Sequence, residues 1–131
     1  MNMQDGVPPR ESPYKGKTGL VRLINALGYS FDGLRAAFRH EDAFRQLVLL
    51  AAVLIPLAFF VHAAPLARAM LVGSSLATLI IELLNSAIEA AVDHTSLERH
   101  PLAKRAKDMG SAAQLLGLIN LAVVWAIVLF G

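Results

Sequence analysis

The stretch IIELLNSAIEAAVD, residues 80–93, decides how the chain must fold. It sets acidic and amide residues into a run that is otherwise apolar and long enough to enter a membrane. At about 100° per residue, a single helical face about 100° wide holds all of its polar residues. They are Glu82, Asn85, Ser86, Glu89 and Asp93. A charged side chain deep in a membrane costs on the order of 2.5–3.5 kcal/mol, so this face must meet protein, water, a metal ion or a substrate rather than lipid.

Composition places the whole chain among membrane proteins. Its 131 residues are 56% hydrophobic with a mean hydropathy of +0.54, which is higher than soluble domains show. The apolar residues gather in three runs, 47–66, 69–92 and 112–131, and about 20 apolar residues cross a bilayer core. The net charge of +2 is mild, which disfavours a nucleic-acid partner. The absence of cysteine excludes disulfides and thiolate chemistry.

The region before the first run divides into two parts. Residues 1–19 hold proline, glycine and charge without an apolar core, so we expect a disordered tail. Residues 20–39 repeat apolar side chains every three or four positions between arginines, which predicts an amphipathic helix lying in the membrane interface. Residues 20–131 are then one membrane domain of a surface helix and three spans, and the fold class is all-α.

Basic residues predict the orientation of these spans. Seven arginines and lysines precede the first span, four lie between the second and third, and only Arg68 lies between the first and second. The positive-inside rule places the amino terminus and the 93–111 loop in the cytoplasm, and the carboxyl terminus outside.

The polar face then runs from the cytoplasmic surface toward the middle of the membrane. Glu89 lies near the surface, where Mg²⁺ bound to a nucleotide can meet one or two carboxylates. Glu82 lies about 10 Å deeper, where it can meet a group carried by a lipid. Glu41, at the mouth of the first span, is a candidate second metal ligand, and Lys107, at the mouth of the third, can neutralise phosphate charge.

Structural readings of the same residues stay open at this point. Glu82 and Glu89 can simply be hydrogen-bonded to neighbouring helices. Arg45 and Lys107 can be anchors whose charged ends reach the interface, and Glu41 can be an acid that favours a helix start.

Three motifs resemble the signature of bacterial integral-membrane diacylglycerol kinases. They are ELLNSAIEAAVD at 82–93, AKDMGSAA at 106–113 and GYSFDGLRAAFRHEDAFRQ at 28–46. The resemblance implies a homotrimeric helical bundle in the bacterial inner membrane, with active sites between subunits at the cytoplasmic face. It also implies transfer of the γ-phosphoryl group of MgATP to diacylglycerol, which gives phosphatidic acid.

The resemblance further implies a role for individual residues. Glu82 matches the general base for the lipid hydroxyl, Asn85 orients it, and Glu41 with Glu89 matches the Mg²⁺-binding pair. Nucleotide-contacting positions are Arg22, Tyr29, Glu41, Glu89, Glu98, Arg99, His100, Lys107 and Asp108. Lipid-site positions are Ser30, Arg35, Arg45, Gln46, Glu82 and Ser111. The chain departs from the family at Leu47, where glutamate is common, and residues 98–100 fall in a variable loop.

Three rival functions are compatible with parts of the pattern. An undecaprenol kinase would share the core motif, and only a substrate panel separates it from a diacylglycerol kinase. A small proton-coupled transporter is disfavoured because the acids cluster beside a basic cytoplasmic loop. A structural subunit without activity is disfavoured because membrane charge is costly to retain without use.

Overall fold

The described part of the chain, residues 19–95 and 100–131 of a computed structural model, is built from helices without a strand. The four helices are α1 (Gly19–His40), α2 (Asp42–Phe60), α3 (Pro65–Thr95) and α4 (Pro101–Phe130). Of these, α2, α3 and α4 are long and apolar enough to cross a membrane. The expected all-α membrane class is therefore confirmed. Of the expected disordered tail, 1–19, only Gly19 belongs to the described residues, and it begins α1.

The chain divides after Arg35 into two compact units. The first unit holds most of α1, whose large apolar residues are exposed, as suits an amphipathic helix. The second unit, 36–131, begins with the last turn of α1 and contains the three long helices.

The end of α1 is fixed by a side chain of α2. At Glu41 the backbone is extended (φ −116°, ψ 107°), which interrupts the helix. Arg45 reaches back from α2, and its Nη1 donates to the carbonyl oxygens of Phe38 at 2.8 Å and Arg39 at 2.9 Å, while its Nη2 pairs with Asp42. The last carbonyls of a helix lack intrahelical donors, so Arg45 acts as a cap for α1.

The helices do not begin and end where the apolar runs do. The first ends at Phe60, before the expected end at 66, because Val61 is extended and Pro65 starts the next helix. Proline suits the first turn of a helix since it has no N–H to leave unpaired. At the other end, α3 continues to Thr95 and α4 already begins at Pro101. Much of the expected 93–111 loop is therefore helical.

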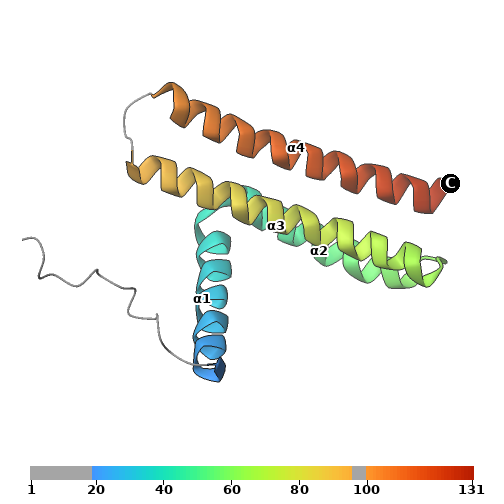
Figure 1. Cartoon of the computed structure of the whole chain (residues 1–131). Helices are drawn as coiled ribbons and strands as arrows, with labels where there is room; N and C mark the ends of the chain where they lie inside the picture. Colours follow the sequence, from blue (N-terminus) through green and yellow to red (C-terminus); the bar gives the residue numbers. More distant parts are fainter. Residues whose placement is uncertain (1–18, 96–99) are drawn as a thin grey trace, which may run out of the picture. The chain divides into compact units, whose positions relative to one another are not determined.

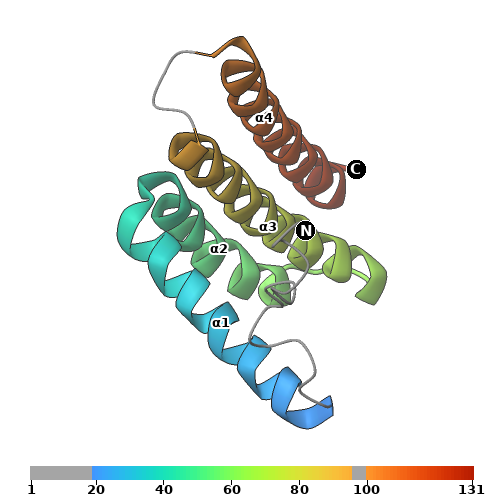
Figure 2. The ribbon, with the colours of Figure 1, turned by 60° about the vertical axis from the view of Figure 1, so that its left-hand side comes forward.

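Helix α3 lies between α2 and α4 and packs against both (Figures 1 and 2). In the most apolar 18-residue segment of α3, 39% of the residues are buried, against 17% in α2 and 22% in α4. Helix α3 is therefore the central helix. An apolar cluster of Ala58, Leu71, Leu121 and Trp125 joins the three helices toward the α2–α3 turn. The polar end of α3 lies away from this cluster.

The α2–α3 turn is held by Arg68. Its Nε donates to the carbonyl of Ala58 at 3.0 Å, and its Nη2 donates to those of Val61 and Ala63, both at 3.3 Å. These carbonyls lie in the last turn of α2 and just beyond its end, where the helix supplies no donors of its own.

Replacing Arg68 by alanine is expected to lower the thermal midpoint of the detergent-solubilised protein, because these carbonyls lose their donor. A buried polar group left without a partner costs about 1–3 kcal/mol of folding free energy. Lysine should restore only part of the loss, since a single ammonium group cannot match the guanidinium fork. Arg105→Ala, an exposed arginine of α4, is the control. Equal midpoints for the two alanine variants would contradict the capping role.

Candidate active site on α3 and α4

The polar face of α3 points inward and its apolar face outward. Glu82 and Asn85 are 6% and 8% exposed, whereas Ile80 and Leu84 of the same helix are 58% and 60% exposed. A soluble protein would bury the apolar face, but a membrane solvates it with lipid. Glu82, Asn85 and Ser86 are therefore covered by protein, as the costly membrane position of these polar groups predicts.

Glu82 is hydrogen-bonded across the α3–α4 interface. Gln114 of α4 donates from Nε2 to Oε2 of Glu82 at 2.9 Å and to the carbonyl of Thr78 at 3.0 Å. Gln114 is itself buried. One carboxylate oxygen of Glu82 is thus hydrogen-bonded, which offsets part of the free-energy cost of burying the acid.

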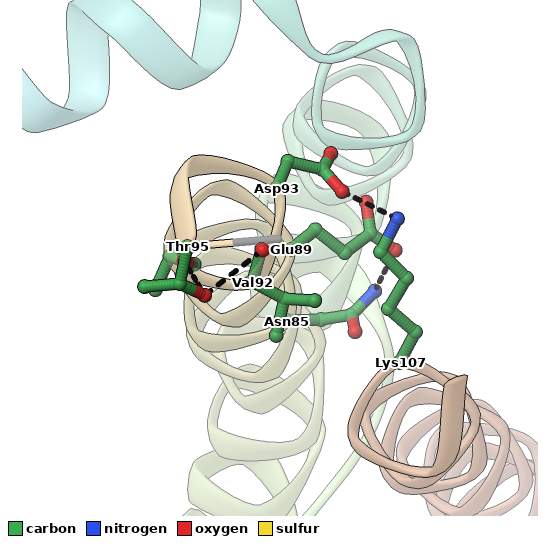
Figure 3. A network of polar contacts seen from close by, with 7 residues as sticks. Asn85, Glu89, Val92, Asp93, Thr95 and Lys107 are labelled. Atoms are coloured by element: carbon green, nitrogen blue, oxygen red, sulfur yellow. Dashed lines mark hydrogen bonds and ion pairs between the residues drawn. The ribbon is translucent and has the colours of Figure 1, made fainter. Parts of the chain in front are cut away.

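A second group of polar contacts lies toward the end of α3 (Figure 3). Asn85 donates from Nδ2 to Oε1 of Glu89 at 3.5 Å, and Lys107 of α4 pairs with Asp93 at 2.6 Å. Figure 3 shows the ammonium group of Lys107 reaching from α4 toward the carboxylates of α3. Exposure increases along this face, from buried Glu82 through half-buried Glu89 to exposed Asp93.

Lys107 lies beside two carboxylates of α3. It lies in the polar first turns of α4, ahead of the apolar run at 112–131. Its hydrogen bond to Asp93 raises the pKa of the ammonium group above its usual value, and the charges of Asp93 and Glu89 act in the same direction. The pair is half exposed, so it is screened by water and weak. An arriving phosphate can therefore compete with Asp93 for the ammonium group.

Gly110 lets the two helices approach at Asn85. A methyl group at Gly110 would overlap Oδ1 of Asn85 and lie 3.2 Å from its Cγ. Oδ1 of Asn85 is buried and has no hydrogen-bond partner among the described residues, so it is an acceptor without a donor. Glycine at 110 is required by this close approach, not by a special backbone angle.

Glu41 lies in the break between α1 and α2, at the N-cap position of α2. Its side chain makes no capping hydrogen bond, so the carboxylate is not used to start the helix. In the described ranges, no group of three or more acidic, histidine or cysteine side chains forms a preassembled metal site. The expected pairing of Glu41 with Glu89 therefore stays a prediction.

Other expected site residues have local partners. His100 caps α4, with its Nδ1 accepting from the backbone N–H of Leu102 at 3.1 Å. Asp108 pairs with Lys104 at 2.6 Å, and Arg45 is the cap described above. Gln46 and Ser111 are exposed. Glu98 and Arg99 lie outside the described residues.

The expected residues on α1 belong to the first unit and are described by themselves. Arg22 and Tyr29 are exposed. Ser30 donates to the carbonyl of Ala26 at 2.9 Å, and Arg35 lies 3.9 Å from the carboxylate of Asp32.

Gln114 and Gly110 were not among the expected site residues. The sequence contains a pattern that could have identified them as one helix face. Gly110, Gln114, Gly117 and Leu121 follow a spacing of four, three and four residues. That spacing places them on one face of α4, and all four are buried. Small residues on one face favour close helix contact in membranes.

Fold and site together define a small helical membrane protein. Its central helix carries a row of carboxylates, the deepest of which is buried, and a lysine of α4 lies at the exposed end of that row. The chain belongs to the prokaryotic diacylglycerol kinase family, whose family model matches residues 28–129. This membership confirms the family suggested by the sequence motifs and the expected class, a membrane-embedded lipid kinase.

Several relatives named diacylglycerol kinase share most of their length with the chain. One from Pseudomonas aeruginosa is 60% identical over 120 residues, which are 92% of this chain and 98% of the relative. One from Haemophilus influenzae is 45% identical over 113 residues, or 86% of this chain and 96% of the relative. One from Escherichia coli K12 is 44% identical over 113 residues, or 86% of this chain and 93% of the relative.

Replacing Gly110 by alanine is expected to displace Asn85 or to part α3 and α4, at a cost of about 1–3 kcal/mol for overpacking. The thermal midpoint should fall, and ATP-dependent lipid phosphorylation should fall with it because Asn85 moves. Gly73→Ala is the matched control, since nothing lies within 4 Å of the Cβ it would add to α3. Wild-type midpoint and activity in Gly110→Ala would contradict the close contact.

Proposed function

We propose that the protein transfers the γ-phosphoryl group of ATP to the hydroxyl of diacylglycerol at the cytoplasmic face of the bacterial inner membrane, and so forms phosphatidic acid. The observation that carries this proposal is the graded polar face of α3, on which Glu82 is buried, Glu89 half-buried and Asp93 exposed. Family membership supports the same reaction. The face joins a water-accessible end, suited to a nucleotide, with a buried carboxylate suited to a lipid alcohol.

The first requirement of phosphoryl transfer is to position the reactants and neutralise charge, because little covalent chemistry falls to the protein. Lys107 supplies a cation at the exposed end of the face, where phosphate oxygens would arrive. Its bond to Asp93 holds the ammonium group beside α3 at 2.6 Å. Lys107 would then exchange Asp93 for phosphate as the nucleotide binds.

The second requirement is a base for the alcohol. Oε2 of Glu82 already accepts from Gln114, which leaves Oε1 to accept the lipid proton. The alcohol oxygen then bonds to the γ-phosphorus, the bond to the bridging oxygen breaks, and ADP leaves with that electron pair. A positioned general base contributes about 10²–10⁴ in rate. Asn85, next to Glu82 on the same face, would orient the alcohol.

The carboxylates of Glu41 and Glu89 fit Mg²⁺. Mg²⁺ is bound by one or two carboxylates with phosphate oxygens and water, and neither side chain is committed to a strong internal bond: Glu41 caps no backbone N–H, and Glu89 accepts one long bond from Asn85. When bound, the ion would supply neutralisation of phosphate charge. A metal that arrives with ATP needs no third protein ligand.

The remaining expected contacts form part of the same proposal. Nucleotide would also meet Arg22, Tyr29, Glu98, Arg99, His100 and Asp108, and lipid would meet Ser30, Arg35, Arg45, Gln46 and Ser111. Sites shared between subunits of a homotrimer are supported by Ala87, Ala90 and Ala91, small residues that are exposed on α3 beside the site and suit close contact with another copy. The amino terminus would lie in the cytoplasm, and the carboxyl terminus in the periplasm.

Purified protein in detergent with MgATP is expected to convert a short-chain diacylglycerol into phosphatidic acid, and Glu82→Gln is expected to lose about 10² or more in kcat because it removes the base. The assay follows labelled phosphate into the lipid, with Arg105→Ala, at an exposed arginine of α4, as a control. Product from undecaprenol alone would replace the substrate and keep the chemistry. Near-normal turnover in Glu82→Gln would exclude the base.

Replacing either carboxylate proposed to bind Mg²⁺ by its amide is expected to raise the free Mg²⁺ concentration needed for turnover. Each replacement removes one hard oxygen ligand. Glu41→Gln and Glu89→Gln are compared with Asp42→Asn, which changes an exposed acid next to Glu41. The measurement is initial rate against free Mg²⁺ at fixed ATP. An unchanged Mg²⁺ profile in both glutamine variants would remove these residues from the metal site.

A further inference from the structure

A buried amide lies against Glu82, outside the residues expected for the site. Gln114 is 8% exposed, and its Nε2 donates to Oε2 of Glu82 at 2.9 Å and to the carbonyl of Thr78 at 3.0 Å. Thr78 is 2% exposed and lies one turn before Glu82 on α3. Both hydrogens of the amide nitrogen are therefore used, and both acceptors belong to α3.

The orientation of this amide is determined by its partners. A flipped amide would set Oε1 against two oxygen acceptors and lose both hydrogen bonds, because only the nitrogen of the amide donates. Oε1 of Gln114 has no partner among the described residues. The carbonyl of Thr78 thus anchors the amide to the main chain of α3, and the amide in turn holds the carboxylate of Glu82.

A glycine near Gln114 makes this reach possible. A Cβ at Gly117 would lie 2.6 Å from Cδ1 of Ile81 and 3.0 Å from Oε1 of Gln114. Gly117 therefore lets α4 approach α3 closely beside the amide. A larger residue at 117 would press on the amide of Gln114 as well as on Ile81.

We infer that Gln114 is a positioning residue that sets the Glu82 carboxylate for proton transfer, an inference that rests on the base role proposed for Glu82. A glutamate side chain has three rotatable bonds, and a base must be held within a fraction of an ångström of its productive place. With Oε2 bound to Gln114, Oε1 is the oxygen that faces the lipid alcohol. Gln114 itself contacts no reacting atom.

A purely structural role makes a different kinetic prediction. If Gln114 only satisfies a buried acid, its loss should destabilise the protein and change kcat only through the folded fraction. If it positions the base, kcat should fall in fully folded protein while the KM values for MgATP and diacylglycerol stay the same, because Gln114 touches neither substrate.

The test is Gln114→Met, which keeps the length of the side chain and removes the donor. We expect the kcat of folded protein to fall roughly ten- to a hundredfold, with both KM values unchanged. The thermal midpoint should also fall, because the buried Glu82 loses its donor, so kcat is measured per folded protein. Asn120→Met is the matched control, because it makes the same kind of change at an exposed amide of α4, and it should keep wild-type kcat. Gln114→Asn, whose amide is one methylene too short to reach Glu82, should behave as Gln114→Met does.

A double-mutant cycle shows whether the effect acts through Glu82. In Glu82→Asp the carboxylate withdraws by one methylene and loses the bond to Gln114. Adding Gln114→Met to that variant should therefore cause little further loss, so the two effects should not add. An equal loss from Gln114→Met in both backgrounds would overturn the inference, since Gln114 would then act elsewhere.

Three further outcomes would overturn the inference, and they distinguish a failure of the positioning role from a failure of the base role. Wild-type kcat in folded Gln114→Met, with Glu82→Gln inactive, would reject the positioning role and leave the base in place. A fall in thermal midpoint that accounts for the whole fall in activity, in both Gln114→Met and Gln114→Asn, would assign Gln114 to stability alone. Full activity in Glu82→Gln would reject the base itself.

Discussion

The hydrogen bond between Gln114 and Glu82 is the interaction on which the rest of the arrangement depends. A charged side chain deep in a membrane costs on the order of 2.5–3.5 kcal/mol, and a hydrogen bond to a charged group contributes about 1.5–3 kcal/mol. One buried amide therefore offsets most of the cost of one carboxylate. Since the amide comes from α4, the contact between α3 and α4 stabilises Glu82 in its buried position.

Contact between these helices cannot rest on apolar burial, because lipid tails are as apolar as leucine and give helices no hydrophobic reason to associate. Few large apolar residues are buried, and most of those of α2 and α4 face outward. Close packing at Gly110 and Gly117 and hydrogen bonds across the interface add to the small apolar cluster that joins the helices. The features that allow the chemistry therefore also hold α3 and α4 together.

The sequence predicted the helical class and the inward polar face well, because both follow from periodicity and run length. The helix ends were missed because an apolar run reports membrane thickness, whereas α3 and α4 continue into polar residues. Arg45 was expected at the lipid site, and that role stays a prediction; the cap that it forms on α1 could not be foreseen, since the direction of a long side chain depends on tertiary neighbours. Gln114 was missed because a single amide in an apolar run shows its importance only once α4 is placed against α3.

At the proposed site, the graded polar face of α3 would let one helix serve two substrates of opposite solubility. The polar face carries Asp93 in water, Glu89 at half burial and Glu82 in the interior, over about 10 Å between the two glutamates. A nucleotide need not enter the membrane, and a lipid need not leave it, if the phosphoryl group is passed between these levels. A helix that ended soon after Glu82 would lack Glu89 and Asp93, the carboxylates that lie nearer Lys107 of α4. In the proposed site, the polar turns of α3 and α4 would therefore matter as much as the buried carboxylate.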